Sequence, residues 1–154
     1  MTEEKTPLPR LTQAALNNII AKHEMFRQSR AGGARAKLSN HDLSGLIFAD
    51  RDLSYADFTS SILLEANFER TKLDYAQLFA CDMRKANCKG ASLVRADLRG
   101  ACLRGAIMAG ADLTGADMRE GSLATYDPEK GLSFHSEGAA WAAGTGGVDM
   151  RGAN

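Results

Sequence analysis

The sequence is poor in the features that define several common classes of protein. Its 154 residues include one Trp, three Tyr and six Phe, fewer large aromatic side chains than a conventional globular core carries. Its three cysteines are odd in number and lack the regular spacing of a disulfide framework, which argues against a secreted domain held together by disulfides. The 19 basic and 19 acidic residues balance, so the charge marks neither an obvious nucleic-acid binder nor an acidic DNA mimic.

Long apolar runs are missing as well. No stretch of 18 apolar residues occurs in the chain, so we expect no transmembrane helix. The first ten residues, MTEEKTPLPR, lack the apolar segment of a signal peptide. We therefore expect a cytoplasmic protein without membrane contact.

What the sequence has instead is an unbroken repeat of five residues. Stepping by five from Leu38 to Leu123 meets an apolar residue or Cys at all eighteen positions, here called the centres. Two residues before each centre, from Ala56 onward, the side chain is small. The centres predicted to form the structural core are Leu53, Phe58, Leu63, Phe68, Leu73, Leu78, Met83, Cys88, Leu93, Leu98, Leu103, Met108, Leu113 and Met118.

A period of five fits neither a helix at 3.6 residues per turn nor a strand at two. It predicts a chain that turns a corner every five residues, so that four sides close into a square coil. The centre and the small residue point inward, and the backbone pairs with the coils above and below at about 4.8 Å. The predicted fold is all-β: a quadrilateral parallel β-helix, or solenoid, of about four and a half coils.

Segments such as Ala96-Asp97-Leu98-Arg99-Gly100 and Ala111-Asp112-Leu113-Thr114-Gly115 resemble the A(D/N)LXX motif of the pentapeptide repeat family. The resemblance covers residues 36 to 124 and implies that the coils are right-handed. Some members of this family modulate DNA gyrase by imitating the shape and charge of DNA, which makes a gyrase or topoisomerase modulator the alternative function. Against it, residues 36 to 124 contain 11 basic and 12 acidic residues, whereas a DNA mimic needs a strongly acidic surface.

An α-helix is predicted ahead of the repeats. Thr12 is a suitable N-cap, and the apolar residues that follow have helical spacing up to a Gly-rich break before Gly33. We expect this helix to cap the open first coil, and a helix ahead of the repeats also resembles what some bacterial members of the family carry. The predicted cap residues are Leu16, Ile19, Ile20 and Phe26.

The predicted organisation has four parts. Residues 1–10 form a disordered tail, residues 11–35 the capping helix and Gly-rich turn, and residues 36–124 the β-helix. Residues 125–154 form a loop or short-helix tail, in which Trp141 would cover the last coil. The repeat pattern resumes at Val148, which favours a chain that is part of a longer protein.

Few residues have the chemistry of a catalytic or metal site. His23 and His41 could face each other and hold a metal, but no carboxylate or cysteine spacing supports this, so packed imidazoles are the favoured interpretation. Cys81 and Cys88 fall on inward positions, and Cys102 lies outward without a visible base or oxyanion site. We expect no enzyme activity, no metal and no cofactor.

The surface is where function is expected. Residues twenty apart stack in columns. Two adjacent columns form what we call the basic strip, with the apolar residues Leu64 and Phe79 below Arg84, Arg99, Arg104 and Arg119. A third column, at a corner, places Tyr55 and Tyr75 below Arg95. The candidate interaction surface is Tyr55, Leu64, Tyr75, Phe79, Arg84, Arg95, Arg99, Arg104, Arg119 and Trp141. Tyr and Arg are enriched at protein interfaces, although Asp97 and Asp117 lie beside the strip and would neutralise part of it.

The function predicted from these patterns is a non-catalytic scaffold whose rigid faces bind another protein. The partner is not identified by the sequence, and both a monomer and an end-to-end homodimer fit the pattern. Nucleic-acid binding by the arginine strip is disfavoured, because phosphate binding needs basic groups without acidic neighbours.

Overall fold

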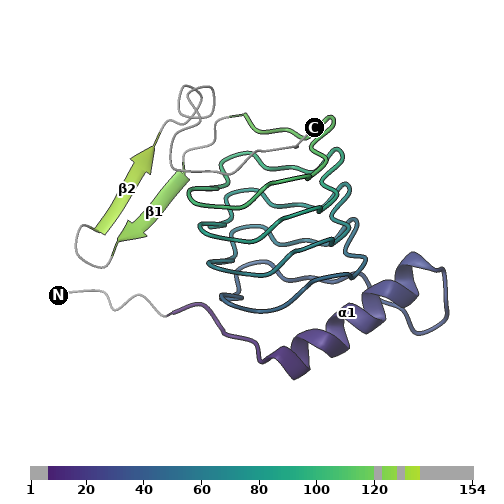
Figure 1. Cartoon of the computed structure of the whole chain (residues 1–154). Helices are drawn as coiled ribbons and strands as arrows, with labels where there is room; N and C mark the ends of the chain where they lie inside the picture. The colour runs from purple at the N-terminus through teal and green to yellow at the C-terminus, as the bar shows by residue number, and fades with distance from the viewer. Residues whose placement is uncertain (1–6, 120–122, 128–130, 136–154) are drawn as a thin grey trace.

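The computed structural model describes residues 7–119, 123–127 and 131–135. Parallel backbone bridges join residues twenty positions apart, from Lys37–Asp57 through to Asp97–Asp117. The chain therefore returns to the same side after twenty residues, and each coil has four sides of five residues, stacked as Figure 1 shows. Each side contributes a single bridge residue, so the sides are too short to form extended strands.

Each side of a coil ends in a left-handed turn. The second residue after each centre has φ between 55° and 72° at all sixteen positions from Asn40 to Gly115. The next N–H then closes the turn on the centre's carbonyl, as Ala56 N does on Leu53 O at 3.0 Å. A positive φ at the third residue of a hydrogen-bonded turn is the geometry of a type II turn, and it produces the corner.

Where Asp or Asn directly precedes a centre, its side chain has a structural role. The Oδ1 atom of Asp57 accepts a hydrogen bond from Thr59 N at 3.0 Å, and Asn67 does the same for Glu69 N. This contact recurs at nine such positions along the coils. The repeated Asp and Asn of the motif thus bond the local backbone, as the regularity of the pattern indicates.

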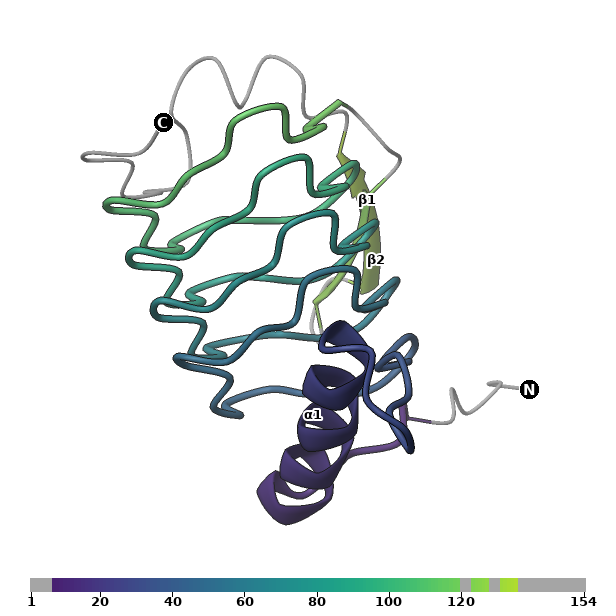
Figure 2. The ribbon, with the colours of Figure 1, turned by 90° about the vertical axis from the view of Figure 1, so that its right-hand side faces the viewer.

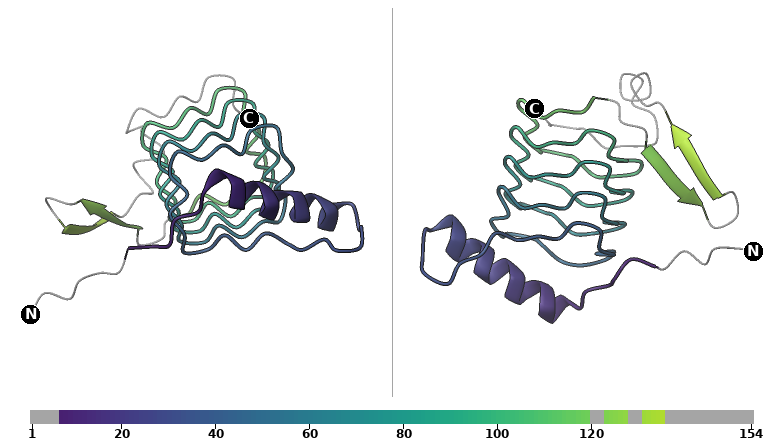
Figure 3. Two further views of the ribbon diagram at one scale, coloured as in Figure 1. Left: turned by 90° about the horizontal axis from the view of Figure 1, so that it is seen from below. Right: turned by 180° about the vertical axis from the view of Figure 1, so that it is seen from behind.

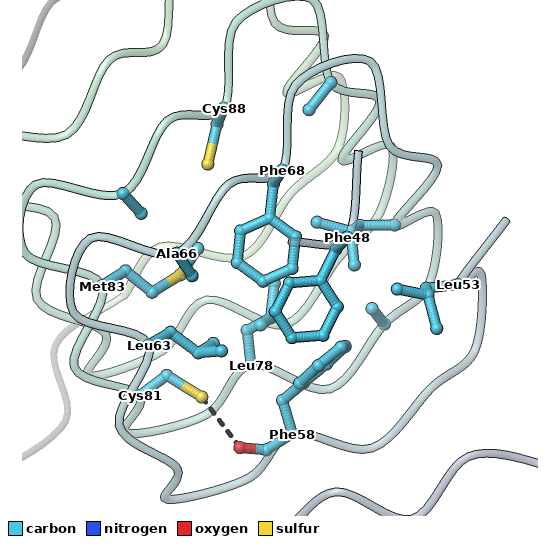
Figure 4. Packing of buried hydrophobic residues seen from close by; sticks show 14 of the residues in the cluster. Phe48, Leu53, Phe58, Leu63, Ala66, Phe68, Leu78, Cys81, Met83 and Cys88 are labelled. Carbon is cyan, nitrogen blue, oxygen red and sulfur yellow. Dashed lines mark hydrogen bonds between the residues drawn. The ribbon is translucent and has the colours of Figure 1, made fainter. Parts of the chain in front are cut away.

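The interior of the coils is filled by the centres and the small residues. Centres from Leu53 to Leu113 are buried, whereas Met118, in the last described coil, is only partly buried. The rings of Phe48 and Phe68 stack at 4.5 Å between centroids, and Phe58 meets both edge-on (Figure 4). Such aromatic contacts fill the narrow interior across two successive coils.

Polar groups inside the coils are also paired. The hydroxyl of Thr71 donates to Phe48 O at 2.9 Å, and Cys81 Sγ donates to Phe58 O at 2.9 Å (Figure 4). Ser61 Oγ donates to Leu38 O and accepts from His41 N. The hydroxyl thus links the two ends of the Leu38–His41 turn, in place of a direct hydrogen bond between them. Polar residues at small positions therefore serve the backbone of the coil below.

Helix α1 (Gln13–Arg27) lies across the lower end of the first coil (Figures 2 and 3). Thr12 is its N-cap, with Oγ1 accepting from Ala15 N at 3.1 Å. Leu16, Ile20 and His23 are fully buried against the coil, and Ile19 is partly buried.

Phe26 is not a cap residue, contrary to the expectation from helical spacing. Its side chain is 41% exposed. At about 100° per residue, Phe26 lies about 80° from Leu16 around the helix. His23 lies close to the buried direction and fills the inward place at this end of α1.

The cap supplies the hydrogen bonds that a preceding coil would make. Three downward N–H groups on the first coil belong to Asp42, Ile47 and Asp52. They donate to Pro9 O at 2.9 Å, to Oε1 of Gln13 at 2.8 Å and to Oε2 of Glu24 at 3.2 Å, respectively. Because unpaired strand edges invite association with other chains, these contacts close the lower edge of the β-helix.

Two further strands follow the coils. Strands β1 (Leu123–Asp127) and β2 (Gly131–His135) form an antiparallel hairpin in which Leu123 is opposite His135 and Asp127 is opposite Gly131. A loop or short helix was the expectation after residue 124. The sequence signal for a strand was present as Thr125 and Tyr126 ahead of the dipeptide Asp-Pro. Trp141 and the resumed repeat from Val148 lie outside the described residues.

Candidate interaction surface

One corner of the β-helix carries two exposed tyrosines. Tyr55 and Tyr75 are 41% and 45% exposed and occupy the left-handed turn position in successive coils. Their rings stack at 5.0 Å between centroids with an interplanar angle of 1°. The twenty-residue coil produces this stacking, because it places equivalent side chains directly above one another.

Arginines surround this tyrosine pair. The guanidinium of Arg27, at the end of α1, lies over the Tyr55 ring at 4.8 Å from its centroid. Arg35 Nε donates to Tyr55 O at 2.6 Å, and Arg95 follows Tyr75 in the same column. The sequence placed Arg95 above the two tyrosines in one column. The structure brings Arg27 from α1 to the Tyr55 ring, which column counting within the repeats could not reveal. Together Arg27, Arg35, Tyr55, Tyr75 and Arg95 form what we call the tyrosine corner.

Cations of the tyrosine corner are largely free of acidic partners. Within the described residues, no carboxylate oxygen lies within 4 Å of Arg35 or Arg95. Arg27 has Asp52 at 3.7 Å. Asp74, the nearest acidic residue in sequence to Tyr75, accepts hydrogen bonds from Ser92 Oγ and Val94 N instead. The corner therefore combines aromatic surface with positive charge that is available to a partner.

The basic strip differs in this respect. Arg84 binds Asp82 through two hydrogen bonds of 2.9 and 2.7 Å, and Arg99 binds Asp97 in the same way. Arg119 likewise binds Asp117 and lowers the pKa of that carboxyl to about 2. Each of these guanidinium groups is thus neutralised by the aspartate two residues before it.

The remaining strip residues form a mixed surface. Phe79 is 37% exposed, with the Arg99 guanidinium 5.3 Å from its ring centroid. Leu64 is half-buried. Arg104 is exposed and has no carboxylate within 4 Å among the described residues. The strip thus offers one unneutralised cation, fewer than the tyrosine corner.

The histidines and cysteines do not assemble into a reactive site. In the described part of the chain, no group of three His, Cys, Asp or Glu side chains could hold a metal ion. His23 and His41 each bond backbone groups. Burial raises the pKa of both Cys81 and Cys88 to about 12 and also raises that of Cys102, so these thiols stay protonated near neutral pH.

α1, at 15 residues, is too short and too polar to cross a membrane, and the described residues contain no other helix.

The sequence matches the family model for pentapeptide repeats, with eight copies over residues 52–78 and 81–120. No functionally curated protein matches it.

Solved structures of pentapeptide repeat proteins resemble this chain. HetL, involved in heterocyst differentiation regulation in Nostoc sp. strain PCC 7120, is 34% identical with a TM-score of 0.54. This match covers 66% of our chain and 48% of HetL. A protein of the Arabidopsis thaliana thylakoid lumen is 29% identical with a TM-score of 0.50, covering 73% of our chain and 60% of that one. The chain therefore spans about half to three-fifths of these relatives.

A further match, QnrB1, is a plasmid-mediated fluoroquinolone resistance protein. It is 17% identical with a TM-score of 0.33, covering 83% of our chain and 70% of QnrB1, and it carries no argument about function. The family model and the two more similar structures imply a right-handed β-helix. With the twenty-residue coil and its Asp/Asn contacts, they show that this chain is a pentapeptide repeat protein.

Proposed function

We propose that this protein is a non-catalytic scaffold that binds a partner protein through the tyrosine corner. The observation that carries the proposal is the exposed, stacked pair of Tyr55 and Tyr75, with Arg35 and Arg95 beside it and no carboxylate within 4 Å of either arginine in the described residues. Tyrosine and arginine are the residue types most enriched at interface hot spots.

The rigidity of the coil supports this role. Tyr75 lies in a backbone position fixed from both sides, since its N–H donates to Val94 O and its neighbour Ala76 closes the turn on Leu73 O. A side chain held in place loses little conformational freedom on binding, which improves affinity. The positive charge of the corner fits an acidic segment of the partner.

The alternative function, modulation of gyrase by DNA mimicry, has less support. Within residues 36–119, 11 basic and 11 acidic side chains balance. A DNA mimic needs a continuous acidic surface, whereas Asp82, Asp97 and Asp117 each pair with an arginine.

The test compares two surfaces by affinity capture from host lysate followed by titration of the purified partner. The corner variant carries Tyr75→Ser and Arg95→Ser, which lie away from α1. The control variant carries Arg84→Gln and Arg99→Gln in the basic strip. We expect the corner variant to bind the captured partner at least tenfold more weakly, as loss of a hot spot of about 1.4 kcal/mol or more requires, and the control to bind as the wild type does.

Equal binding by both variants, with unchanged circular dichroism, would remove the tyrosine corner as the docking surface. Loss of binding only in the control would assign it to the basic strip. Capture of gyrase subunits, with inhibition of supercoiling by the wild type, would support the alternative.

A further inference from the structure

His23 is the polar residue at the centre of the contact between α1 and the first coil. It is fully buried. Nδ1 accepts a hydrogen bond from Ala36 N at 2.8 Å, and Nε2 lies 2.8 Å from Ser54 O. Because a carbonyl can only accept, the proton is on Nε2, and the ring is neutral with both nitrogens used.

Protonation of this ring is incompatible with its surroundings. A proton on Nδ1 would point at the N–H of Ala36, so an acceptor would become a second donor and the hydrogen bond would be lost. The new charge would also be buried. Of the charged groups nearby, Asp52 on the first coil favours the charge, whereas Arg27 on α1 and Arg35 on the connecting segment oppose it.

The remaining ties between α1 and the coil are largely polar and at the rim. Gln13 pairs with the backbone of Ile47 through two hydrogen bonds. Glu24 bonds Arg51 and Asp52 N, and Arg27 lies 3.7 Å from Asp52. Only Leu16 and Ile20 accompany His23 in full burial. Meanwhile the coils above are joined by their own ladder from Asp57 upward, which uses no group of α1.

We propose that His23 is an acid-sensitive latch, whose protonation releases α1 from the first coil and bares the edge N–H groups of Ile47 and Asp52 while the upper coils stay folded. Release also withdraws Arg27 from the Tyr55 ring. The latch rests on the geometry of the cap and does not depend on what the tyrosine corner binds.

The pH range of the latch follows from the direction of the shift. Burial lowers the pKa of His23 below its ordinary 6.5, so the docked state excludes a proton that the released state takes up. The contribution of His23 to docking is complete above pH 6.5 and declines as the pH falls below it. In this range the equilibrium constant for release rises by up to about tenfold per pH unit.

The carboxylates of the cap act in a lower range. Burial raises the pKa of Glu24 and Asp52, but hydrogen bonds from Arg51, Asp52 N and Ser54 outweigh it and bring both pKa values below their ordinary 4.5 and 3.8. Their contributions are therefore lost only below about pH 4.5. Release between pH 6.5 and 5 is specific to His23.

The experiment is hydrogen exchange with mass spectrometry on the full chain at pH 7.5 and 5.5, normalised for intrinsic exchange. We expect protection of the α1 peptides to fall about tenfold at pH 5.5 and that of coil peptides within residues 76–119 to stay unchanged. His23→Gln keeps a donor and an acceptor without titrating, so its α1 protection should be independent of pH in this range. His41→Gln, the matched control on the half-buried neighbouring histidine, should keep the wild-type response.

The latch would be overturned if hydrogen-exchange protection of α1 in the wild type were the same at both pH values. An undiminished pH response in His23→Gln, or a parallel loss of protection in the upper coils, would also overturn it.

Discussion

At the scale of single residues, the left-handed turn position governs which side chains the corners carry. Ten of the sixteen turn positions hold a residue other than glycine, although this backbone region costs such residues about 1–2 kcal/mol each. Glycine at two upper positions lies against a long side chain from the coil below. A Cβ at Gly105 would be 3.2 Å from Lys85 Cγ, and one at Gly115 would be 3.0 Å from Arg95 Cγ. These glycines thus leave room for the aliphatic parts of the Lys85 and Arg95 side chains.

Replacing Gly105 tests this packing. Gly45 has the same backbone, with φ of +71° against +72°, but nothing within 4 Å of an added Cβ. Gly45→Ala should cost about 1 kcal/mol of unfolding free energy for the backbone alone, and Gly105→Ala should cost more because Lys85 must move. Chemical denaturation followed by circular dichroism measures both. In a Lys85→Ala background the difference should vanish; if it persists, the contact with Lys85 is not its cause.

At the scale of elements, α1 stabilises the fold by reproducing the hydrogen bonds of a coil. The amide of Gln13 is the clearest case. Its Oε1 accepts from Ile47 N at 2.8 Å, and its Nε2 donates to Ile47 O at 2.9 Å. A primary amide offers a donor and an acceptor side by side, as a peptide group does, so this side chain pairs with the edge as a strand would.

Gln13→Glu removes the donor and keeps the acceptor. The carboxylate would face Ile47 O, so we expect α1 to be destabilised by about 1 kcal/mol near neutral pH, the usual loss for an exposed hydrogen bond. Protonation of this carboxyl near its ordinary pKa of about 4.3 restores a donor, so the deficit relative to the wild type should shrink toward pH 4. The melting temperatures of both proteins across this range provide the measurement. A deficit that grows on acidification would contradict the imitation of a strand.

The sequence predicted the elements whose cause is local and missed those that join distant segments. The five-residue period placed the centres from Leu53 to Leu113 in the interior because each position obeys the same rule. Thr12 and the apolar spacing likewise placed α1. The contacts of Gln13 with Ile47 and of Arg27 with Tyr55 depend on the angle at which α1 crosses the coil. No periodicity in the repeats encodes that angle.

At the scale of the whole molecule, charge is distributed unevenly along the β-helix. Residues 36–75 contain four basic and seven acidic side chains, and residues 76–119 contain seven basic and four acidic ones. The cap partly offsets the acidic lower coils, since Arg10 pairs with Asp42 and Arg27 with Asp52. The net positive charge of the β-helix therefore lies on the upper coils, which carry Arg95.

The stack also predicts that stability depends on position along the axis, because each coil contacts only its neighbours. Leu73 and Leu113 belong to one column of centres; Leu73 is fully buried between Leu53 and Leu93, whereas Leu113 is 7% exposed. Leu73→Ala should cost about 2–5 kcal/mol, the range for a buried leucine. It should also weaken the coupling between the coils on either side, broadening the unfolding transition. Leu113→Ala should fall at or below the lower end of that range and leave the transition sharp. Guanidinium unfolding of both variants, monitored by circular dichroism, compares midpoint and slope. Equal losses at the two sites would mean that the coils unfold as one unit from end to end, in which case acid release of α1 would take the whole stack with it.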